Sequence, residues 1–392
     1  MTTDGTGKTI GIINSGGDCA GINTVIASSV IAGIRAGYKF VGFELGWEGL
    51  IDRKYYELDL ADAVRIQNLG GTILRTTNRG RFAAKVGMGE TRRIDPDILQ
   101  ACKDTIDDMN LDGLLVIGGD GTLSGALQLA EYGVNMVGIP KSIDNDLYAT
   151  DLTFGFQSAV QVAVDAIDRI QTTAFSHNRI FMVECMGRNA GWLSLYAGLA
   201  SGSDAILLPE FPTSLDDIVK FLRHRRDNHR DSTVLVVSEA FKIDGKAVTR
   251  GSAATNEVIF TGITEALTRQ IEEVAPDEFE MRNVVLGHTQ RGGSPCAADR
   301  ILSKRFGTRA IEAYQAGKFG HMVALQNDNI EVVSIAEAVD QLKLVTRDDK
   351  IYQVARQTGI FMGDLDDYMK TAHGYDDVKV DDVRFILDEE PV

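Results

Sequence analysis

The sequence predicts an α/β protein in which helices cover both faces of mainly parallel sheets. Short runs of apolar, β-branched residues recur along its 392 residues, and each run ends abruptly in glycines and polar residues. Hydrophobicity within the runs is continuous rather than alternating, which is typical of strands buried on both faces of a parallel sheet. Because most runs are followed by a segment with helical periodicity, the pattern indicates a doubly wound architecture.

The order of the elements follows from these runs. Strands are predicted at residues 9–13, 114–117, 136–139, 180–183, 234–237 and 284–286. Apolar residues at helical spacing predict one helix after Asn23 and another from Leu123 to Ala130. In doubly wound sheets, ligands bind beyond the carboxyl ends of the strands, which is where the polar clusters fall.

Composition and charge exclude several classes of partner. Forty Lys and Arg against 56 Asp and Glu give a net charge of −16, so the field of the protein repels polyanions. We therefore expect neither nucleic acid nor an anionic membrane as a partner. No apolar run reaches the ~18 residues of a membrane span, and the first residues lack a signal pattern. The four cysteines show no metal-ligand spacing and favour a reducing compartment, so we expect a cytoplasmic protein.

Two glycine-rich turns predict contacts with phosphate groups. Residues 15–18 (SGGD) and 118–122 (GGDGT) each place glycines between a strand and a helix, where backbone N–H groups can approach a polyphosphate. Neither is a Walker loop or a GxGxxG motif. Asp120 offers a carboxylate suited to Mg²⁺. The alternative is that Asp120 caps the helix that begins near Thr122.

Residues 140–146 (PKSIDND) supply candidates for a catalytic base and a metal ligand. A hydroxyl that attacks a phosphoryl group needs a carboxylate to accept its proton, and the metal needs another. Asp144 and Asp146 can each perform one of these tasks, whereas the alternative is a structural Asx turn. On the acceptor side, guanidinium groups next to glycine-bearing strand ends suit a phosphate monoester, and these belong to Arg179, Arg188, Arg282 and Arg291.

Together these segments resemble the phosphofructokinase A family, the 6-phosphofructokinases that use ATP or pyrophosphate. The motifs occur in the family's order over about residues 8–345, as GGDCAGIN (16–23), GGDGT (118–122), PKSIDND (140–146), MGRNAGW (186–192) and LGHTQRGGSP (286–295). NAD kinases and lipid kinases share only GGDGT. The resemblance implies transfer of the terminal phosphoryl of Mg-ATP to the 1-hydroxyl of fructose 6-phosphate, giving fructose 1,6-bisphosphate in glycolysis.

The resemblance also implies two doubly wound, Rossmann-like lobes with the active site in the cleft between them. We expect residues 1–155 with about 290–340 to bind the phosphoryl donor, and residues 156–289 with about 341–373 to bind the sugar phosphate. Residues 374–392 are expected to form an acidic tail.

Roles for single residues follow from the same resemblance. Donor contacts are expected from Gly17, Gly118, Gly119, Asp120, Gly121, Thr122 and Lys141, and Mg²⁺ contacts from Asp120 and Asp146. The sugar hydroxyl is expected to lose its proton to Asp144, with Ser142 and Arg188 near the transferred phosphoryl. Sugar-phosphate contacts are expected from Ser142, Asp144, Met186, Gly187, Arg188, Glu239, His288 and Arg291. Arg179 and Arg282 match positions that reach this phosphate from a neighbouring subunit, which implies a homo-oligomer, either a dimer or a tetramer.

The sequence departs from the common bacterial pattern at two places. Direct counting puts Asn78 where an arginine usually bridges the transferring phosphates, and we expect Arg79 to take that role after a one-residue shift. The positions of the bacterial effector-site arginines are occupied by Ala27, Ile31 and Leu60. Control by phosphoenolpyruvate or ADP of that type is therefore not expected.

The choice of donor rests on two positions. Gly121 leaves room for the α-phosphate of a nucleotide, where pyrophosphate users resemble GGDD, whereas Lys141 is shared by pyrophosphate users and some ATP users. We expect ATP, because a carboxylate beside the α-phosphate would clash with it and repel it. Trp47 offers a face for adenine or is a buried structural residue. Three alternatives stay open: a pyrophosphate-dependent enzyme, a kinase for sedoheptulose 7-phosphate or tagatose 6-phosphate, and a non-catalytic regulatory paralogue.

Overall fold

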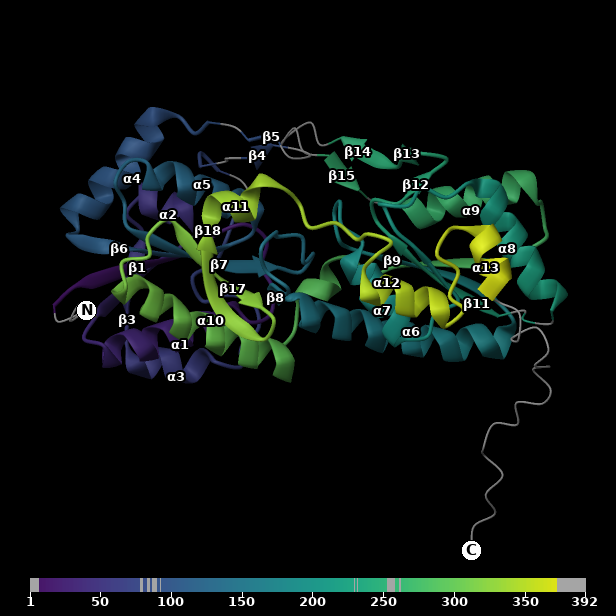
Figure 1. Ribbon diagram of the computed structural model, residues 1–392, viewed down its shortest axis with the longest axis horizontal. Coiled ribbons are helices and arrows are strands. Elements are labelled where there is room, and N and C mark those ends of the chain that lie inside the picture. Colours follow the sequence, from purple (N-terminus) through teal and green to yellow (C-terminus); the bar gives the residue numbers. More distant parts are fainter. Residues whose placement is uncertain are drawn as a thin grey trace, which may run out of the picture. The chain divides into compact units, whose positions relative to one another are not determined.

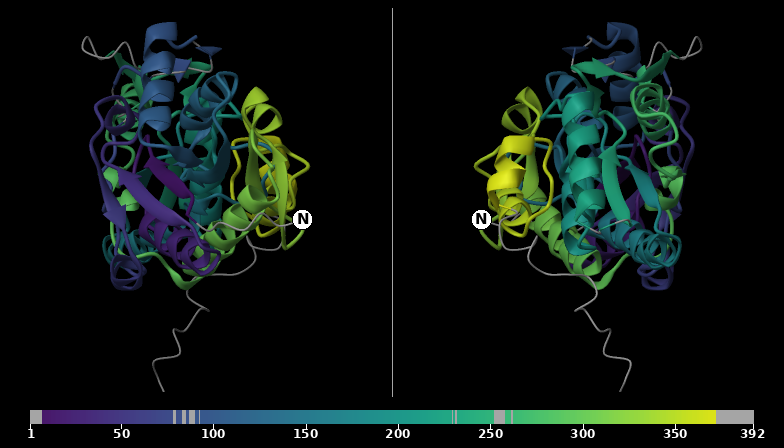
Figure 2. Two further views of the ribbon diagram at one scale, coloured as in Figure 1. Left: turned by 90° about the vertical axis from the view of Figure 1, so that its left-hand side faces the viewer. Right: turned by 90° about the vertical axis from the view of Figure 1, so that its right-hand side faces the viewer.

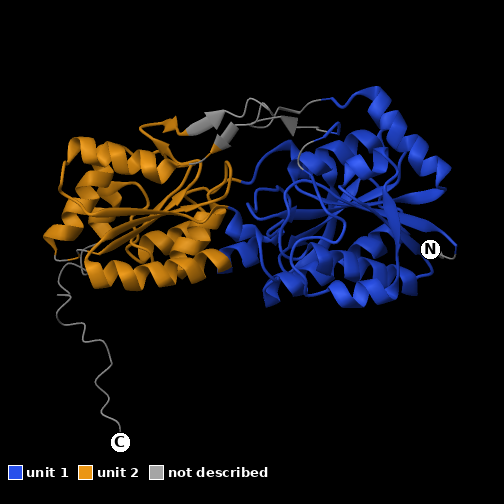
Figure 3. Ribbon diagram, turned by 180° about the vertical axis from the view of Figure 1, so that it is seen from behind, with its two compact units in different colours: residues 1–161, 251–258, 288–343 blue, residues 162–250, 259–287, 344–392 orange. Residues whose placement is uncertain are grey.

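The chain divides into two compact units (Figure 3). The computed structural model describes residues 7–77, 80–82, 85–86, 90–91, 93–228, 230, 232–251, 258–260 and 262–371. Unit 1 contains residues 1–161, 251–258 and 288–343, and unit 2 contains residues 162–250, 259–287 and 344–392. Asn78, Arg79 and the acidic tail expected at 374–392 lie outside the described residues.

A mainly parallel sheet forms the centre of unit 1. The strands lie in the order β18-β17-β7-β6-β1-β2-β3, with β8 beside β7. The edge pairs β2–β3 and β17–β18 are antiparallel, and the pairs between them are parallel. The bounds are β1 (Thr9–Asn14), β2 (Lys39–Phe43), β3 (Tyr55–Leu58), β6 (Leu111–Gly118), β7 (Met136–Ser142), β8 (Phe154–Gly155), β17 (His321–Gln326) and β18 (Asn329–Ser334).

Helices cover both faces of this sheet (Figures 1 and 2). One face carries α2 (Trp47–Ile51), α4 (Pro96–Asp108), α5 (Asp120–Ala130) and α11 (Ile335–Asp340). The other face carries α1 (Ile22–Arg35), α3 (Leu60–Ile66) and α10 (Ala297–Gln315). The central residues Leu114, Leu115 and Val116 of β6 are fully buried, which explains why this strand reads as a continuous apolar run. A short hairpin, β4 (Lys85–Val86) with β5 (Glu90–Thr91), also belongs to unit 1.

The starts of two of these helices follow from the local sequence. Asp95 caps α4 by accepting a hydrogen bond from the Asp97 N–H, and Pro96 occupies the first helical position, where no N–H is needed. Asp59 and Asp62 form a reciprocal capping box at the start of α3. Side-chain caps therefore determine the residues at which these two helices begin.

Unit 2 has a parallel sheet in the order β10-β11-β9-β16. Its strands are β9 (Ile180–Cys185), β10 (Ala205–Leu207), β11 (Thr233–Ser238) and β16 (Met281–Val285). One apolar cluster joins the sheet to α8 (Leu215–Asp227), α9 (Ile263–Val274) and α13 (Leu365–Thr371), and another joins it to α6 (Phe156–His177) and α7 (Trp192–Ala200). The remaining elements are α12 (Lys350–Gln357), η1 (Gly287–Arg291), β12 (Lys242–Ile243), β13 (Lys246–Ala247), β14 (Thr249–Gly251) and β15 (Val258–Phe260).

The predicted α/β class with mostly parallel sheets is confirmed, with one local exception. Strand β16 was expected to be buried on both faces, but it is an edge strand, and Val285 is 50% exposed. A short run of apolar residues does not distinguish an edge strand from a central one. Among the described residues, none of the helices has both the length and the apolar character to cross a bilayer.

Candidate active site

A buried lysine holds the loop between β1 and α1. Lys141 lies in β7 and is only 4% exposed. Its ammonium group donates to the carbonyl of Ser15, at 3.0 Å, and to the carbonyl of Gly17. Burial lowers the pKa of Lys141 to about 8, because desolvation disfavours the charged form. The lysine is thus fixed against the backbone of the first glycine-rich turn.

The other carbonyls of the same turn are held by two further side chains. The Thr76 hydroxyl donates to the carbonyl of Gly16 at 2.6 Å, and Arg291 donates from Nη1 to the carbonyl of Asp18 at 3.0 Å. Gly16 has a φ of 84°, in the left-handed region that glycine adopts without strain. At Gly17, an added Cβ would lie 2.7 Å from Arg291 Nη1. The backbone of this turn therefore requires glycine at position 16, whereas a side chain at position 17 would displace the Arg291 guanidinium group.

The second glycine-rich turn leads directly into α5. The helix begins at Asp120, and its N-cap is Gly119, which has no side chain with which to cap. The proposed cap role of Asp120 is therefore wrong. Its carboxylate stands at the first helical residue, where the helix dipole favours negative charge. An added Cβ at Gly118 would lie 2.3 Å from the Cβ of Thr122, and Gly121 is exposed.

After β7, the chain forms a turn that is held by its own side chains. Ser142 donates from its hydroxyl to Asp146 Oδ1 at 2.8 Å, and it accepts from the Asp144 N–H at 3.1 Å. Asn145 adopts a φ of 51°, and its Oδ1 accepts from the Thr153 N–H at 3.0 Å. This Asn145 contact spans eight residues, so it has a structural role but is not the Asx turn considered from the sequence. Asp144 is 5% exposed in the same turn.

The two candidate metal ligands follow neighbouring strands. Asp120 comes after β6 and Asp146 after β7, and these strands are paired in parallel with Gly118 opposite Pro140. Among the described residues, no group of three or more His, Cys, Asp or Glu side chains has metal-binding geometry. Two carboxylates suit Mg²⁺, which commonly takes one or two carboxylates and completes its shell with phosphate oxygens and water.

In unit 2, a glutamate orders the turn after β9. Glu239 follows β11, and its Oε1 accepts from the N–H groups of Gly187, at 3.3 Å, and Arg188, at 2.9 Å. Gly187 has a φ of 149° and Arg188 a φ of 48°, so both residues are in the left-handed half of conformational space. Met186, at the start of this turn, is half-buried and the Arg188 side chain is exposed. Neighbouring parallel strands thus bring these predicted residues together.

Arg179 and Arg282 also lie together, but at the other end of the same sheet. Both guanidinium groups contact Glu280 Oε1, each at 2.7 Å. Arg179 immediately precedes β9, and Arg282 is the second residue of β16. The expectation that these arginines adjoin the carboxyl ends of strands is therefore wrong. They occupy the amino ends, because β9 and β16 run in parallel with Met281 opposite Ile180.

The remaining sugar-phosphate candidates belong to unit 1. His288 and Arg291 lie in the short 3₁₀ helix η1, and the His288 side chain is exposed. The candidates are therefore divided between the units, with Met186, Gly187, Arg188 and Glu239 in unit 2.

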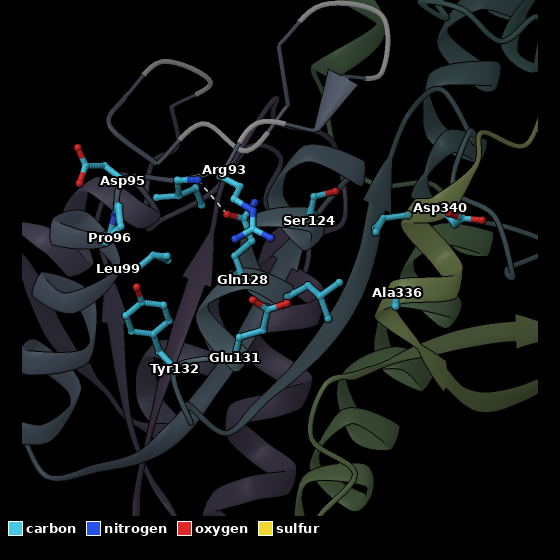
Figure 4. A pocket seen from close by; sticks show the side chains of 13 residues that line it. Arg93, Asp95, Pro96, Leu99, Ser124, Gln128, Glu131, Tyr132, Ala336 and Asp340 are labelled. Carbon is cyan, nitrogen blue, oxygen red and sulfur yellow. Dashed lines mark hydrogen bonds between the residues drawn. The ribbon is translucent and has the colours of Figure 1, made fainter.

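A cavity of about 730 Å³ lies along α5 in unit 1 (Figure 4). Its walls come from the start of α4, from α5 and from α11, and they combine apolar side chains such as Leu99 and Leu127 with polar ones such as Gln128. The Ile94 N–H donates to Gln128 Oε1 at 2.8 Å, the dashed line in Figure 4. The cavity begins at Ser124, about one helical turn after Asp120.

The structure separates the two interpretations of Trp47. The indole is 3% exposed and stacks on Phe82, with ring centroids 4.2 Å apart and an interplanar angle of 18°. Because its face is covered by Phe82, Trp47 has a structural role. Neither the cavity nor the contact of Thr76 was found from the sequence. The local sequence around Thr76 does not indicate its contact, because the partner, Gly16, is 60 residues away along the chain.

Known proteins are similar to this chain over most of its length. The family model described as phosphofructokinase matches residues 9–314. An ATP-dependent 6-phosphofructokinase of Chloroflexus aurantiacus is 42% identical over 356 residues, covering 91% of this chain and 98% of that protein. A pyrophosphate–fructose 6-phosphate 1-phosphotransferase of Amycolatopsis methanolica is 42% identical over 339 residues, covering 86% and 96%.

A solved structure shows the same relationship. The crystal structure of Pichia pastoris phosphofructokinase in the T-state superposes with a TM-score of 0.72 and 28% sequence identity. The match covers 93% of this chain and 37% of the longer yeast chain. Since relatives named for ATP and for pyrophosphate are equally similar at 42%, overall identity does not determine the phosphoryl donor.

Proposed function

This chain belongs to the phosphofructokinase family, and we propose that it transfers the terminal phosphoryl group of ATP to the 1-hydroxyl of fructose 6-phosphate. The chain is a phosphotransferase of the 6-phosphofructokinase type. ATP as the donor, the roles of individual residues and the assembly state belong to the proposal. Its support comes from the groups that surround the amino end of α5 and the end of β7.

The observation that carries ATP as the donor is the space along α5. Phosphates bound at the amino end of this helix would lie beside Asp120 and the exposed Gly121. The cavity that starts at Ser124 would then be next to these phosphates. From Ser124 to Glu131 the helix rises ~10 Å, which matches the length of an adenosine group. We propose that this cavity receives the nucleoside.

The phosphoryl transfer itself requires few reacting groups from the protein. We propose that Asp144 accepts the proton of the sugar hydroxyl while Ser142 and Arg188 contact the transferring phosphoryl. Asp120 and Asp146 would hold Mg²⁺, which neutralises charge on the phosphates when bound. Backbone N–H groups of the two glycine-rich turns orient the donor, so positioning and electrostatics supply most of the rate enhancement.

The sugar phosphate draws on residues from both units in this proposal. Arg291 and His288 contact it from unit 1, and Met186, Gly187 and Glu239 from unit 2. Arg179 is seven residues before Met186, and an extended strand rises ~3.3 Å per residue, so these two residues, which flank β9, are ~23 Å apart. One sugar phosphate cannot contact both ends of β9, and we therefore propose that Arg179 and Arg282 serve the site of a second subunit.

The second candidate is a pyrophosphate-dependent enzyme. It is favoured by the relative of Amycolatopsis methanolica, whose name states this donor, and by the lysine at position 141. We place either activity in the cytoplasm, because Cys19, Cys102, Cys185 and Cys296 are free thiols and such thiols persist in reducing compartments.

One set of assays tests the proposed function. Purified protein with Mg²⁺ is given ATP or pyrophosphate, each with fructose 6-phosphate, sedoheptulose 7-phosphate or tagatose 6-phosphate. We expect the highest kcat/KM for ATP with fructose 6-phosphate. Higher kcat/KM with pyrophosphate would establish the second candidate, and a preference for another ketose phosphate would reassign the acceptor. Turnover with none of the pairs would contradict both functions.

A further inference from the structure

Four consecutive carbonyl groups of the β1–α1 loop are each held by a side chain from another segment. Ser15 and Gly17 are held by Lys141, Gly16 by Thr76, and Asp18 by Arg291. We call residues 15–18 the donor loop, since the proposed function places the donor phosphates there. We propose that Lys141 and Thr76 are positioning residues, which act on the donor through the backbone of this loop and not by contacting its phosphates.

The planarity of the peptide bond links these contacts to the donor. In a trans peptide the C=O of one residue and the N–H of the next point in opposite directions. When Thr76 fixes the carbonyl of Gly16, it also fixes the direction of the Gly17 N–H. Lys141 does the same for the Asp18 N–H through the carbonyl of Gly17. Backbone N–H groups of a glycine-rich loop are suited to bind phosphate only when their directions are fixed in advance.

Lys141 reaches the donor loop across the carboxyl end of the strand that lies between them. In the sheet, β6 lies between β7, which carries Lys141, and β1, which leads into the loop. Adjacent strands are ~4.8 Å apart, so the side chain has to extend across the end of β6. Gly118 and Gly119 occupy that end, and an added Cβ at Gly119 would lie 3.2 Å from the Lys141 carbonyl oxygen. A side chain at Gly119 would therefore press on the backbone of Lys141, whereas one at Gly118 would collide with Thr122.

Thr76 distinguishes the positioning role from direct binding. Its hydroxyl is neutral and donates to Gly16 at 2.6 Å, so its removal takes no charge away from the donor site. A direct phosphate ligand at Lys141 would make donor binding depend on the lysine and not on Thr76. A positioned loop makes it depend on both. The comparison therefore needs one substitution at each residue and the double substitution.

The test uses the full-length protein and direct binding. Calorimetry with Mg²⁺ measures the Kd of a non-hydrolysable ATP analogue, of pyrophosphate and of fructose 6-phosphate for wild type, Thr76→Val and Lys141→Met. Thr76→Val loses one loop-holding hydrogen bond and is expected to weaken the donor ~10-fold, and Lys141→Met loses two and is expected to weaken it at least as much. The Kd of fructose 6-phosphate should stay within ~2-fold in both variants. Thr105→Val is the matched control, because the Thr105 hydroxyl also donates to a backbone carbonyl, Ala101 in α4 at 3.0 Å.

The double variant provides the second readout. Because either loss releases the same loop, Thr76→Val with Lys141→Met should bind the donor within ~3-fold of Lys141→Met alone. Fully additive losses, or a Thr76→Val variant that binds the donor like wild type, would overturn the positioning role. Should Lys141→Met not fold, as judged by circular dichroism, Thr76→Val alone decides between these outcomes.

Binding keeps this inference distinct from the proposed function on which it rests. Wild type that binds the donor with the expected variant pattern, but transfers no phosphoryl group to any sugar phosphate, would reject the proposed function and retain the positioning role. Wild type that transfers the phosphoryl group, with a Thr76→Val variant whose donor binding is unchanged, would retain the proposed function and reject the positioning role. Wild type that binds neither donor would overturn both.

Discussion

At the scale of single residues, Asp144 has the strongest predicted effect on catalysis. It is a buried carboxylate in a turn whose backbone is fixed by Ser142 and Asn145, so replacing its side chain leaves the turn's other hydrogen bonds in place. In Asp144→Ser we expect kcat to fall ~10²–10⁴-fold with the KM for fructose 6-phosphate nearly unchanged, because a general base acts mainly in the transition state. Steady-state kinetics with both substrates varied measure this split.

A control for Asp144 comes from the same turn. Asn145→Asp changes an amide that has a structural contact with Thr153, and its effect should appear in the melting temperature more than in kcat. A kcat of Asp144→Ser within ~10-fold of wild type would remove Asp144 from the role of base.

Gly121 carries the donor prediction. It is exposed at the second position of α5, directly after Asp120. We expect Gly121→Asp to lower kcat/KM for ATP ~10-fold or more, because a second carboxylate there repels the α-phosphate, and to lower kcat/KM for pyrophosphate less. Gly121→Ala adds a Cβ without charge and separates steric from electrostatic effects. An equal loss for both donors in Gly121→Asp would contradict this account.

At the scale of secondary-structure elements, the end of α8 is tied down by a shared carboxylate. Arg223 and Arg226 in the last turns of the helix both contact Glu278, each at 2.7 Å. Hydrogen bonds from these arginines, first from Arg223, lower the pKa of Glu278 from 4.5 to about 2. The folded state thus favours the charged carboxylate more strongly than the unfolded state does.

This shift predicts how stability depends on pH. Because the folded pKa lies below the unfolded one, the contribution of Glu278 is fully present above about pH 4.5 and is lost as the pH falls toward about 2. The melting temperature of Glu278→Gln should therefore be lower than that of wild type at pH 6, and the two should converge as the pH falls to about 2. The difference should be small and should shrink in ~1 M salt, since both arginines are partly exposed. A difference that grows on acidification would contradict the assignment.

Elements also show what the sequence could and could not predict. The predicted strands correspond to β1, β6, β7, β9, β11 and β16, because each combines a continuous apolar run with a polar cluster at its end. Strands β2 and β17 were not predicted, although most of their residues are buried. Neither strand is followed by a cluster of polar residues suited to bind phosphate. The next strand after each, β3 and β18, pairs with it in antiparallel orientation at the edge of the sheet. A search based on strand ends therefore finds strands that carry the site and misses those that complete the sheet.

Within the candidate site, the same distinction separates local from distant contacts. Both glycine-rich turns and the turn at Ser142 to Asp146 were predictable, because each is a local sequence between a strand and the next element. The hydrogen bonds that hold the donor loop join residues 60, 124, 126 and 273 positions apart. No local periodicity encodes such contacts. Lys141 was therefore expected to contact the donor, whereas its position against backbone carbonyls leads to the positioning role proposed above.

At the scale of the whole molecule, the amino ends of β9 and β16 carry a consequence for assembly. Arg179 and Arg282 share Glu280 at the end of the sheet opposite to Glu239. Their cationic groups thus lie together on a surface of unit 2 that the proposed site, at the opposite end of this sheet, does not use. In a homo-oligomer with closed symmetry, each subunit both supplies this surface and receives it.

Mixed oligomers test this arrangement directly. Asp144→Ser subunits lack the base but keep both arginines, whereas Arg179→Met/Arg282→Met subunits keep the base. Each variant alone should be nearly inactive. In a hybrid dimer, one site combines Asp144 of the arginine-variant subunit with the two arginines of the Asp144→Ser subunit. That site is intact, and the other site lacks both. Random assembly of dimers yields one half hybrids with one intact site of two, so co-expression should recover ~25% of wild-type activity.

A control with two site-breaking variants sharpens this test. Asp144→Ser mixed with Asp120→Asn should stay inactive, because each subunit destroys the site in which its own carboxylate acts and no intact site can form. Recovery with this control pair would indicate exchange of larger segments between subunits. Absence of recovery with the arginine variant, in preparations shown by native mass spectrometry to contain hybrids, would place Arg179 and Arg282 outside the neighbouring site.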